Sequence, residues 1–222
     1  MAKLPAAVAF DVVETLISLE PLGERFEEVG LPAGAVREWF ARTLMCGFAL
    51  SATGDYAPFP VAAGEALRLV SGHRASDDDV AHVLAGFADL PSHRDAEPAM
   101  RMLRESGVRV ACLTNGAAAT TEAFLARSGL DSHVEQVIAT AEVSSWKPPA
   151  RVYRHALDRL GLPAEDVALV AVHAWDCHGA KRAGLTTGWA RRLEGGYGRI
   201  FAPADVVGDD LVEVARGLLA LP

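Results

Sequence analysis

The chain has 222 residues, half of them hydrophobic, which is enough to bury one sizeable core or a core with a small additional domain. It carries 21 basic and 29 acidic side chains, giving a formal net charge of −8. With no cluster of lysine and arginine, this balance argues against a nucleic-acid-binding protein and against recruitment to anionic membranes. A small anionic substrate is still possible, because a local pocket can be positive on an acidic protein.

No stretch approaches the roughly 18 apolar residues that a membrane-spanning helix requires, and the N-terminal apolar run is too short for a signal peptide. The three cysteines, Cys46, Cys112 and Cys177, are widely spaced and odd in number. Their spacing matches no zinc pattern and argues against a disulfide framework. We therefore expect a cytoplasmic protein whose cysteines are small buried side chains.

Short apolar runs predict the β-strands of the chain. They span residues 6–13, 108–114, 134–140, 167–173 and, more weakly, 186–190. Their continuous apolar character is typical of parallel strands that are covered on both faces. Predicted helices at 96–106, 117–128 and 150–160 alternate with these strands, and a glycine suited to a left-handed cap follows each helix. The pattern predicts an α/β fold with a doubly wound parallel sheet.

Residues 17–92 show a different pattern, with apolar side chains at helical spacing and no convincing strand. Ser76 and Asp79 resemble a capping box at the start of one such helix. We therefore expect an α/β core made of residues 1–16 and 93–222, with residues 17–92 inserted after the first strand as a helical cap.

Polar side chains follow the predicted strands at the edge where an open α/β sheet binds ligands. Asp11 follows the first strand, Thr114 and Asn115 the second, Lys147 the third and Asp176 the fourth. Taken singly, each has a simpler interpretation as a helix cap or, for the lysine, as a solvated loop charge. Their order and spacing together favour one site, in which a nucleophilic carboxylate is oriented by a cation.

These residues resemble the four motifs of the haloacid dehalogenase superfamily. The motifs are matched by Asp11 with Thr15, by Thr114-Asn115-Gly116, by Lys147-Pro148, and by Asp176 with Gly179-Ala180 and Ala183-Gly184. The resemblance covers almost the whole chain, including the point where the cap is inserted. It implies a Rossmann-like core and Asp11 as a covalent nucleophile.

Two branches of this superfamily differ at positions that the sequence shows. The phosphatases carry a second Asp two residues after the nucleophile and an acidic pair that binds Mg²⁺. Here the first position is Val13, and only Asp176 remains of the pair, which makes a poor Mg²⁺ site. The motifs around Lys147-Pro148, Arg151-Val152-Tyr153 and Ala174-Trp175-Asp176 are more similar to the type II (S)-2-haloacid dehalogenases, which use no cofactor. A Mg²⁺-dependent phosphatase and a non-catalytic binding protein with this fold remain as alternatives.

The dehalogenase resemblance implies a two-step hydrolysis of a small 2-haloalkanoic acid. Asp11 would displace the halide from C2, and water would hydrolyse the resulting aspartyl ester at the Asp11 carbonyl to give a 2-hydroxy acid of inverted configuration. Lys147 would keep Asp11 ionised and oriented. Asp176 would hold Lys147 or help to position the water.

The resemblance also assigns the contacts to the substrate. Thr114 and nearby backbone N–H groups would receive the carboxylate. Asn115 would face the halide, and Trp175 would help to wall the halide pocket. Val12 and Val13, which follow the nucleophile, are further candidate substrate contacts.

The chain departs from the type II dehalogenases at four positions. Val13 replaces an aromatic residue, Glu14 a glycine, His173 an asparagine, and Phe40, after Trp39, the arginine that binds the halide. Arg37 or Arg42 could take the place of that arginine. Losing a donor to developing charge typically costs about 2.7–4 kcal/mol, so an uncompensated loss would impair dehalogenation badly.

His173 admits two interpretations. It is either a strand-end histidine satisfied by the backbone or a compact donor in the halide or water site, which would favour a small halide such as fluoride. In the second case an imidazole with its ordinary pKa of ~6.5 would make turnover depend on pH near that value.

A homodimer is a further expectation, because dimers are usual in this family. The cap residues Trp39, Phe40, Phe48 and Leu50 offer an apolar face that a second subunit could cover.

Overall fold

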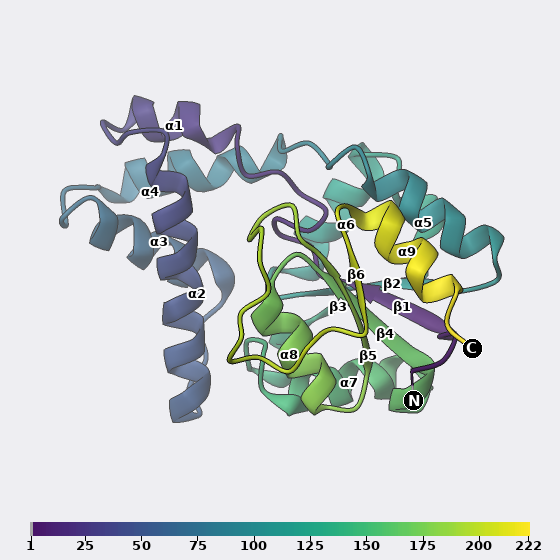
Figure 1. Cartoon of the computed structure of the whole chain (residues 1–222). Coiled ribbons are helices and arrows are strands. Elements are labelled where there is room, and N and C mark those ends of the chain that lie inside the picture. The colour runs from purple at the N-terminus through teal and green to yellow at the C-terminus, as the bar shows by residue number, and fades with distance from the viewer. Residues whose placement is uncertain (1) are drawn as a thin grey trace.

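The computed structural model describes residues 2–222, which contain one six-stranded sheet in the order β3-β2-β1-β4-β5-β6 (Figure 1). All strand pairs are parallel. The strands are β1 (Ala7–Phe10), β2 (Arg109–Thr114), β3 (Gln136–Ala139), β4 (Val167–Ala171), β5 (Thr186–Ala190) and β6 (Val206–Gly208). The predicted doubly wound α/β sheet is confirmed.

The strand predictions were wrong in two details. The first strand ends at Phe10 rather than at Val13, because the chain leaves the sheet at Asp11 to form the loop of the site. Strand β6 was missed, because it has three residues and its middle residue, Val207, is exposed, which leaves no pattern to detect.

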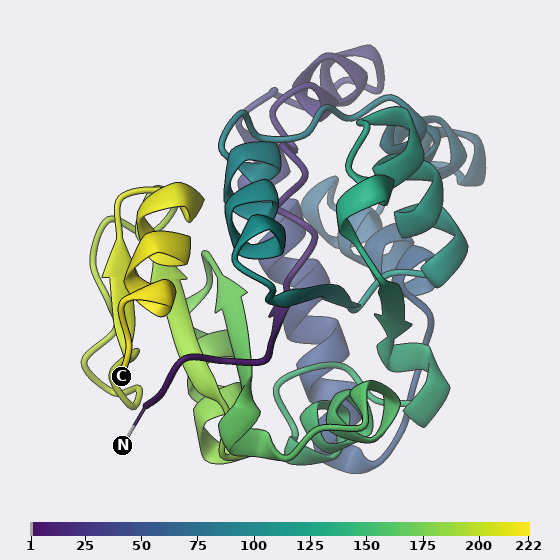
Figure 2. The ribbon, with the colours of Figure 1, turned by 90° about the vertical axis from the view of Figure 1, so that its right-hand side faces the viewer.

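Helices cover both faces of the sheet. Alternate residues of β1 point to opposite faces, so each face of this strand packs against a different set of helices. Val8 and Phe10 belong to the same hydrophobic cluster as residues of α5 (Ala96–Glu105), α6 (Ala118–Arg127) and α9 (Leu211–Leu219). Ala7 and Ala9 belong to a second cluster with residues of α7 (Ala150–Leu160) and α8 (Ala174–Arg182). The two termini lie side by side at the amino end of β1 (Figure 2), where the Leu4 N–H donates to the Pro222 carbonyl at 3.0 Å.

Between β1 and α5 the chain forms α1 (Leu22–Glu28), α2 (Ala35–Thr53), α3 (Phe59–Val70) and α4 (Asp77–Ala85), which lie beside the sheet (Figure 1). None of the six strands lies in this segment. The expected capping box is present, since Asp79 N donates to Ser76 Oγ at 3.1 Å and Ser76 N donates to Asp79 Oδ2 at 2.8 Å. The division into a core (1–16 and 93–222) and a cap (17–92) remains our interpretation of this arrangement.

The burial of several apolar side chains differs from what the sequence predicted. Cys112 and Cys177 are buried as expected, whereas Cys46 is only partly buried. Trp39 and Phe40 are buried within the chain, so they are not part of the exposed apolar face that we expected a second subunit to cover. No helix within residues 2–222 combines the length and the apolar character needed to cross a membrane.

Trp146 joins the cap to the core. Its side chain is fully buried, its indole N–H donates to the Ala57 carbonyl at 2.9 Å, and its ring stacks on Phe59 with centroids 5.9 Å apart. Gly47 of α2 lies directly against the indole, and a methyl group on it would overlap the ring.

We therefore expect Gly47→Ala to destabilise the protein by about 1–3 kcal/mol, because the overlap outweighs the better helix propensity of alanine. Urea unfolding measures the effect. Gly34→Ala at the start of the same helix is the matched control, since Gly34 has a φ of −63° and open space around it. Equal unfolding midpoints for the two variants would show that the indole does not pack tightly on α2.

Candidate active site

The carboxyl ends of β1, β2 and β4 meet at one edge of the sheet, and the predicted polar residues gather there. Asp11 follows β1, Thr114 ends β2, and Asp176 lies in the first turn of α8, which follows β4. Lys147 lies in the loop between β3 and α7. Asp11, Lys147 and Asp176, distant in sequence, are in direct contact.

Lys147 is the centre of this cluster and is fully buried. Its Nζ donates to Asp11 Oδ1 at 2.6 Å, to Asp176 Oδ2 at 2.6 Å and to the Leu113 carbonyl oxygen at 3.1 Å. All three ammonium protons therefore have acceptors. Burial lowers the pKa of Lys147, but the charges of the two carboxylates outweigh that effect and raise it. The lysine is held in its charged form.

Asp11 is held as a carboxylate. Its second oxygen, Oδ2, accepts from the Thr15 hydroxyl at 2.6 Å, and the Thr15 oxygen in turn accepts from the Val172 N–H at 3.1 Å. Burial raises the pKa of Asp11, but Lys147 and His173 outweigh it, so the pKa lies well below the ordinary value. An ionised carboxylate in a water-poor site is the form that acts as a nucleophile.

Asp176 supports the lysine. Both of its oxygens are engaged, Oδ2 by Lys147 and Oδ1 by the Tyr153 hydroxyl at 2.6 Å. Burial raises the pKa of Asp176, and the nearby charge of Asp11 adds to that rise. Burial also raises the pKa of Tyr153 well above its ordinary value, so the phenol stays a hydrogen-bond donor. No role was predicted for Tyr153 from the sequence, although its place in the motif around Lys147 was a signal.

Thr114 and Asn115 shape the neighbouring loops. Thr114 Oγ1 accepts from the Gly116 N–H at 2.9 Å. The Thr114 hydroxyl therefore caps the turn after β2, as the simpler interpretation of this residue predicted. Asn115 Oδ1 accepts from the backbone N–H of Lys147 at 2.9 Å, which ties the lysine loop to the end of β2.

Two small cavities lie beside Asp11 and its neighbours Val12 and Val13, where the cap meets the core. The first, of about 10 Å³, has room for roughly one water molecule. It is lined by Asp11, Val13, Phe40, Leu44, Phe59, Asn115, His173 and Trp175. The second, of about 120 Å³, is mostly apolar, and its lining includes Val12, Val13, Phe59, Phe87, Thr114 and Gly116. Lys147 and Asp176 line neither cavity and lie behind Asp11.

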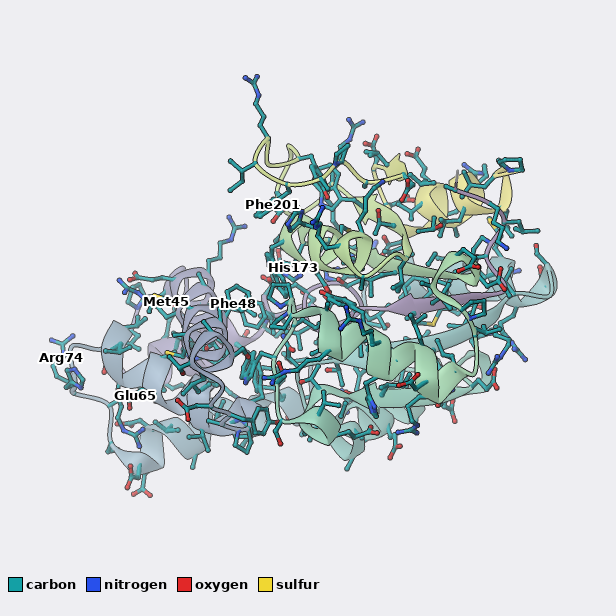
Figure 3. All side chains as sticks on the ribbon, turned by 90° about the horizontal axis from the view of Figure 1, so that it is seen from below. Met45, Phe48, Glu65, Arg74, His173 and Phe201 are labelled. Carbon is teal, nitrogen blue, oxygen red and sulfur yellow. The ribbon has the colours of Figure 1, made fainter. Side chains whose placement is uncertain are left out.

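Aromatic rings occupy the place where the family's arginine was expected. Phe40 lies 6.2 Å from the His173 ring, and Trp175 lies between His173 at 5.3 Å and Phe48 at 4.9 Å, measured between centroids. Figure 3 shows Phe48 of α2 on the cap side and His173 on the core side of the boundary between the two.

Neither candidate arginine lines the cavity at the nucleophile. Arg42 is exposed and lies 3.5 Å from Glu38 on the same helix. Arg37 lines a separate cavity of about 310 Å³, together with Glu14 and Arg192. Glu14, which lines this separate cavity, contacts His173, which lines the cavity beside Asp11.

His173 is buried between two carboxylates. Its Nδ1 lies 3.3 Å from Asp11 Oδ2, and its Nε2 lies 2.9 Å from Glu14 Oε2. Burial lowers the pKa of His173, but its hydrogen bonds to the two acids outweigh that effect and raise the pKa to about 10. The expected titration near the ordinary pKa is therefore wrong for the resting site, and so is the expectation of a ring satisfied by the backbone.

Glu14 adopts a left-handed backbone conformation with a φ of 65°. This conformation costs a residue with a Cβ roughly 1–2 kcal/mol. It explains structurally why glycine suits this position. A glutamate here places its carboxylate beside the imidazole at the expense of backbone strain.

The residues do not fit a Mg²⁺ site. Within residues 2–222 no group of three or more His, Cys, Asp or Glu side chains is arranged to hold a metal ion. Asp176 has no free oxygen, and the positions of the expected additional acids are Val13 and the segment ending in His173. The phosphatase alternative therefore gains no support from the donor set.

Comparison with known proteins places the chain in a family. Residues 5–184 match the model of the haloacid dehalogenase-like hydrolases, so the chain belongs to that family, as the motifs predicted. The chain is 29% identical to an (S)-2-haloacid dehalogenase of Pseudomonas fluorescens, over 99% of this chain and 98% of the relative. It is 28% identical to an (S)-2-haloacid dehalogenase of Pseudomonas putida, over 96% of each.

Solved structures agree with the fold. A dehalogenase crystallised as an intermediate complex superposes with a TM-score of 0.89 at 27% identity, over 100% of both chains. The L-2-haloacid dehalogenase from Xanthobacter autotrophicus superposes with a TM-score of 0.90 at 22% identity, again over 100% of both.

Proposed function

We propose that the protein is a metal-independent 2-haloacid dehalogenase in which Asp11 displaces halide from C2 of a small 2-haloalkanoic acid. The observation that carries the proposal is the buried trio of Asp11, Lys147 and Asp176, with the ionised Asp11 at the wall of a small cavity. The relatives named (S)-2-haloacid dehalogenase support the substrate class.

The chemistry follows from the charges of the site. One oxygen of Asp11 attacks C2, and the bonding electrons of the carbon–halogen bond leave with the halide. Water then adds to Cγ of the resulting aspartyl ester and releases a 2-hydroxy acid with inverted configuration. Lys147 holds the carboxylate ionised and in place, and Asp176 and Tyr153 hold the lysine.

The two cavities offer candidate places for the substrate's own groups. The apolar cavity of about 120 Å³ accepts a short alkyl chain, and Thr114 at its wall is our candidate for the carboxylate. Asn115, His173 and Trp175 line the smaller cavity and are the candidate contacts of the halide or the water. Val12 and Val13 complete the wall, and the short side chain of Val13 leaves room beside the nucleophile.

The test is halide release from 2-chloro- and 2-bromopropionate in the presence of EDTA, with phosphate release from p-nitrophenyl phosphate in Mg²⁺ measured in parallel. We expect halide release that EDTA does not reduce, because the ammonium group of Lys147 supplies the cation of the site. Phosphate release that depends on Mg²⁺, without halide release, would overturn the proposal in favour of the phosphatase.

A non-catalytic binding protein is not favoured by any contact in the site. Burying Lys147 between two carboxylates is costly for a fold that does not use them. A cytoplasmic location and a homodimer remain predictions from the sequence.

A further inference from the structure

We propose that His173 is the general base that activates water for hydrolysis of the aspartyl ester, and that Glu14 positions its ring. The inference rests on the proposed function and concerns its second step. Asp176, which the sequence analysis considered for positioning this water, is in the wrong place to act as the base.

The residues that line the small cavity favour His173 over Asp176 as the general base. Of the described residues that line it, Asp11 and His173 are the titratable ones. The cavity has room for roughly one water beside Asp11, and a base must lie within hydrogen-bond reach of the proton that it removes. His173 meets this condition. Asp176 does not line the cavity, and both of its oxygens already accept hydrogen bonds.

Glu14 orients the imidazole for this task. Its carboxylate holds Nε2 at 2.9 Å, so in the neutral ring the proton stays on Nε2 and the lone pair of Nδ1 points toward Asp11. A carboxylate that fixes the tautomer of a histidine base is a recurrent arrangement in hydrolases. The left-handed backbone of Glu14 fits this interpretation, because backbone strain of this kind concentrates at functional sites.

Formation of the ester changes the charge around His173. In the resting site the ring lies between the carboxylates of Asp11 and Glu14, which raise its pKa to about 10 and so favour the imidazolium. Alkylation neutralises Asp11 and leaves Glu14 as the one carboxylate that contacts the ring. Two further cations lie nearby, Lys147 on the far side of Asp11 and Arg192 at the Glu14 carbonyl, and both favour loss of the proton.

The proton has a route to solvent. The Nδ1 proton passes to water that enters the small cavity as the halide leaves, while the Nε2 proton stays in its hydrogen bond to Glu14. The halide leaves as an anion, and the net release of this stage is one halide and one proton. His173 is then neutral, with Nδ1 free to accept a proton.

The second step balances with these groups. Water transfers one proton to Nδ1 of His173 while its oxygen bonds to Cγ of Asp11. The bond from Cγ to the substrate oxygen then breaks, and the second proton of the water ends on that oxygen to give the 2-hydroxy acid. Asp11 returns as a carboxylate beside a protonated His173, which is the resting state.

The first test follows the ester in His173→Ala by rapid quenching and intact-protein mass spectrometry with 2-chloropropionate. We expect one equivalent of halide to be released, the alkylated protein to accumulate, and ester hydrolysis to slow by about 10²- to 10⁴-fold. His155→Ala is the matched control, because His155 Nε2 lies 2.9 Å from Glu142 Oε2, the same distance as in the His173 pair, but outside the site. It is expected to behave like the wild type.

The second test addresses Glu14 as a positioning residue. In Glu14→Gln the pKa of His173 falls, because one of its two carboxylate partners is gone. Ester hydrolysis needs the neutral imidazole of His173. The rate of hydrolysis therefore rises as the pH increases through the pKa of His173. The rising limb of the hydrolysis rate is thus expected to move to lower pH in Glu14→Gln and to return in Glu14→Asp, which a structural role alone would not produce.

The outcomes separate this inference from the proposed function. Ester hydrolysis at the wild-type rate in His173→Ala, or an unmoved pH limb in Glu14→Gln, overturns the inference while the dehalogenase stands. A wild-type protein that releases no halide and forms no ester overturns the proposed function, and the inference with it.

Discussion

Replacing Asp11 by Asn is expected to abolish halide release, with a loss of about 10⁴-fold or more, because the carboxamide cannot form the aspartyl ester. The geometry leaves no second nucleophile, since Asp176 lies behind Lys147 and lines neither cavity within the described part of the chain. Halide release from 2-chloropropionate at substrate saturation measures the effect.

Asp205→Asn is the matched control for this variant. Asp205 accepts from Lys181 Nζ at 2.7 Å, so the exchange also removes a carboxylate from a lysine pair, but far from the cavities. Its halide release should equal that of the wild type. Activity in Asp11→Asn within tenfold of the wild type would mean that another group carries the chemistry.

Lys147→Met is expected to lower the free energy of unfolding by about 3–5 kcal/mol, in addition to removing activity. Methionine fills similar volume but leaves two buried carboxylates facing each other, Asp11 and Asp176, without their common cation. Part of this loss of stability is offset, because one of the two carboxylates takes up a proton and their repulsion falls. Urea unfolding at neutral pH measures the difference.

The contrast with a surface lysine makes this prediction specific. Lys181→Met removes an ion pair of similar length, 2.7 Å to Asp205, whose lysine side chain is 31% exposed. Exposed pairs contribute within about 1 kcal/mol, so this variant should unfold close to the wild type. Equal destabilisation of the two variants would contradict the central place of Lys147 in the folded site.

The sequence was sufficient for the parts of the site that strand ends dictate. Asp11, Lys147 and Asp176 are brought together because the carboxyl ends of adjacent parallel strands share one edge, and continuous apolar runs marked those strands. Elements without a periodic signal were missed, as the three-residue edge strand β6 shows.

Side-chain pairings that depend on an unusual local backbone conformation could not be predicted. The contact between Glu14 and His173 depends on the left-handed backbone at Glu14, which no local pattern announces. The direction of aromatic side chains on α2 was also ambiguous, because helical spacing does not tell whether a face packs inside the chain or against another subunit. Trp39 and Phe40 pack inside it.

The most direct test of Asp11 as the nucleophile is to follow oxygen in water labelled with heavy oxygen. With enzyme in excess over 2-chloropropionate, the first 2-hydroxy acid formed should carry no label, because its new oxygen comes from Asp11. After repeated turnover, mass spectrometry of the peptide that contains Asp11 should show label in its carboxylate. Label in the first product, with none in Asp11, would contradict the account, because water would then attack C2 directly.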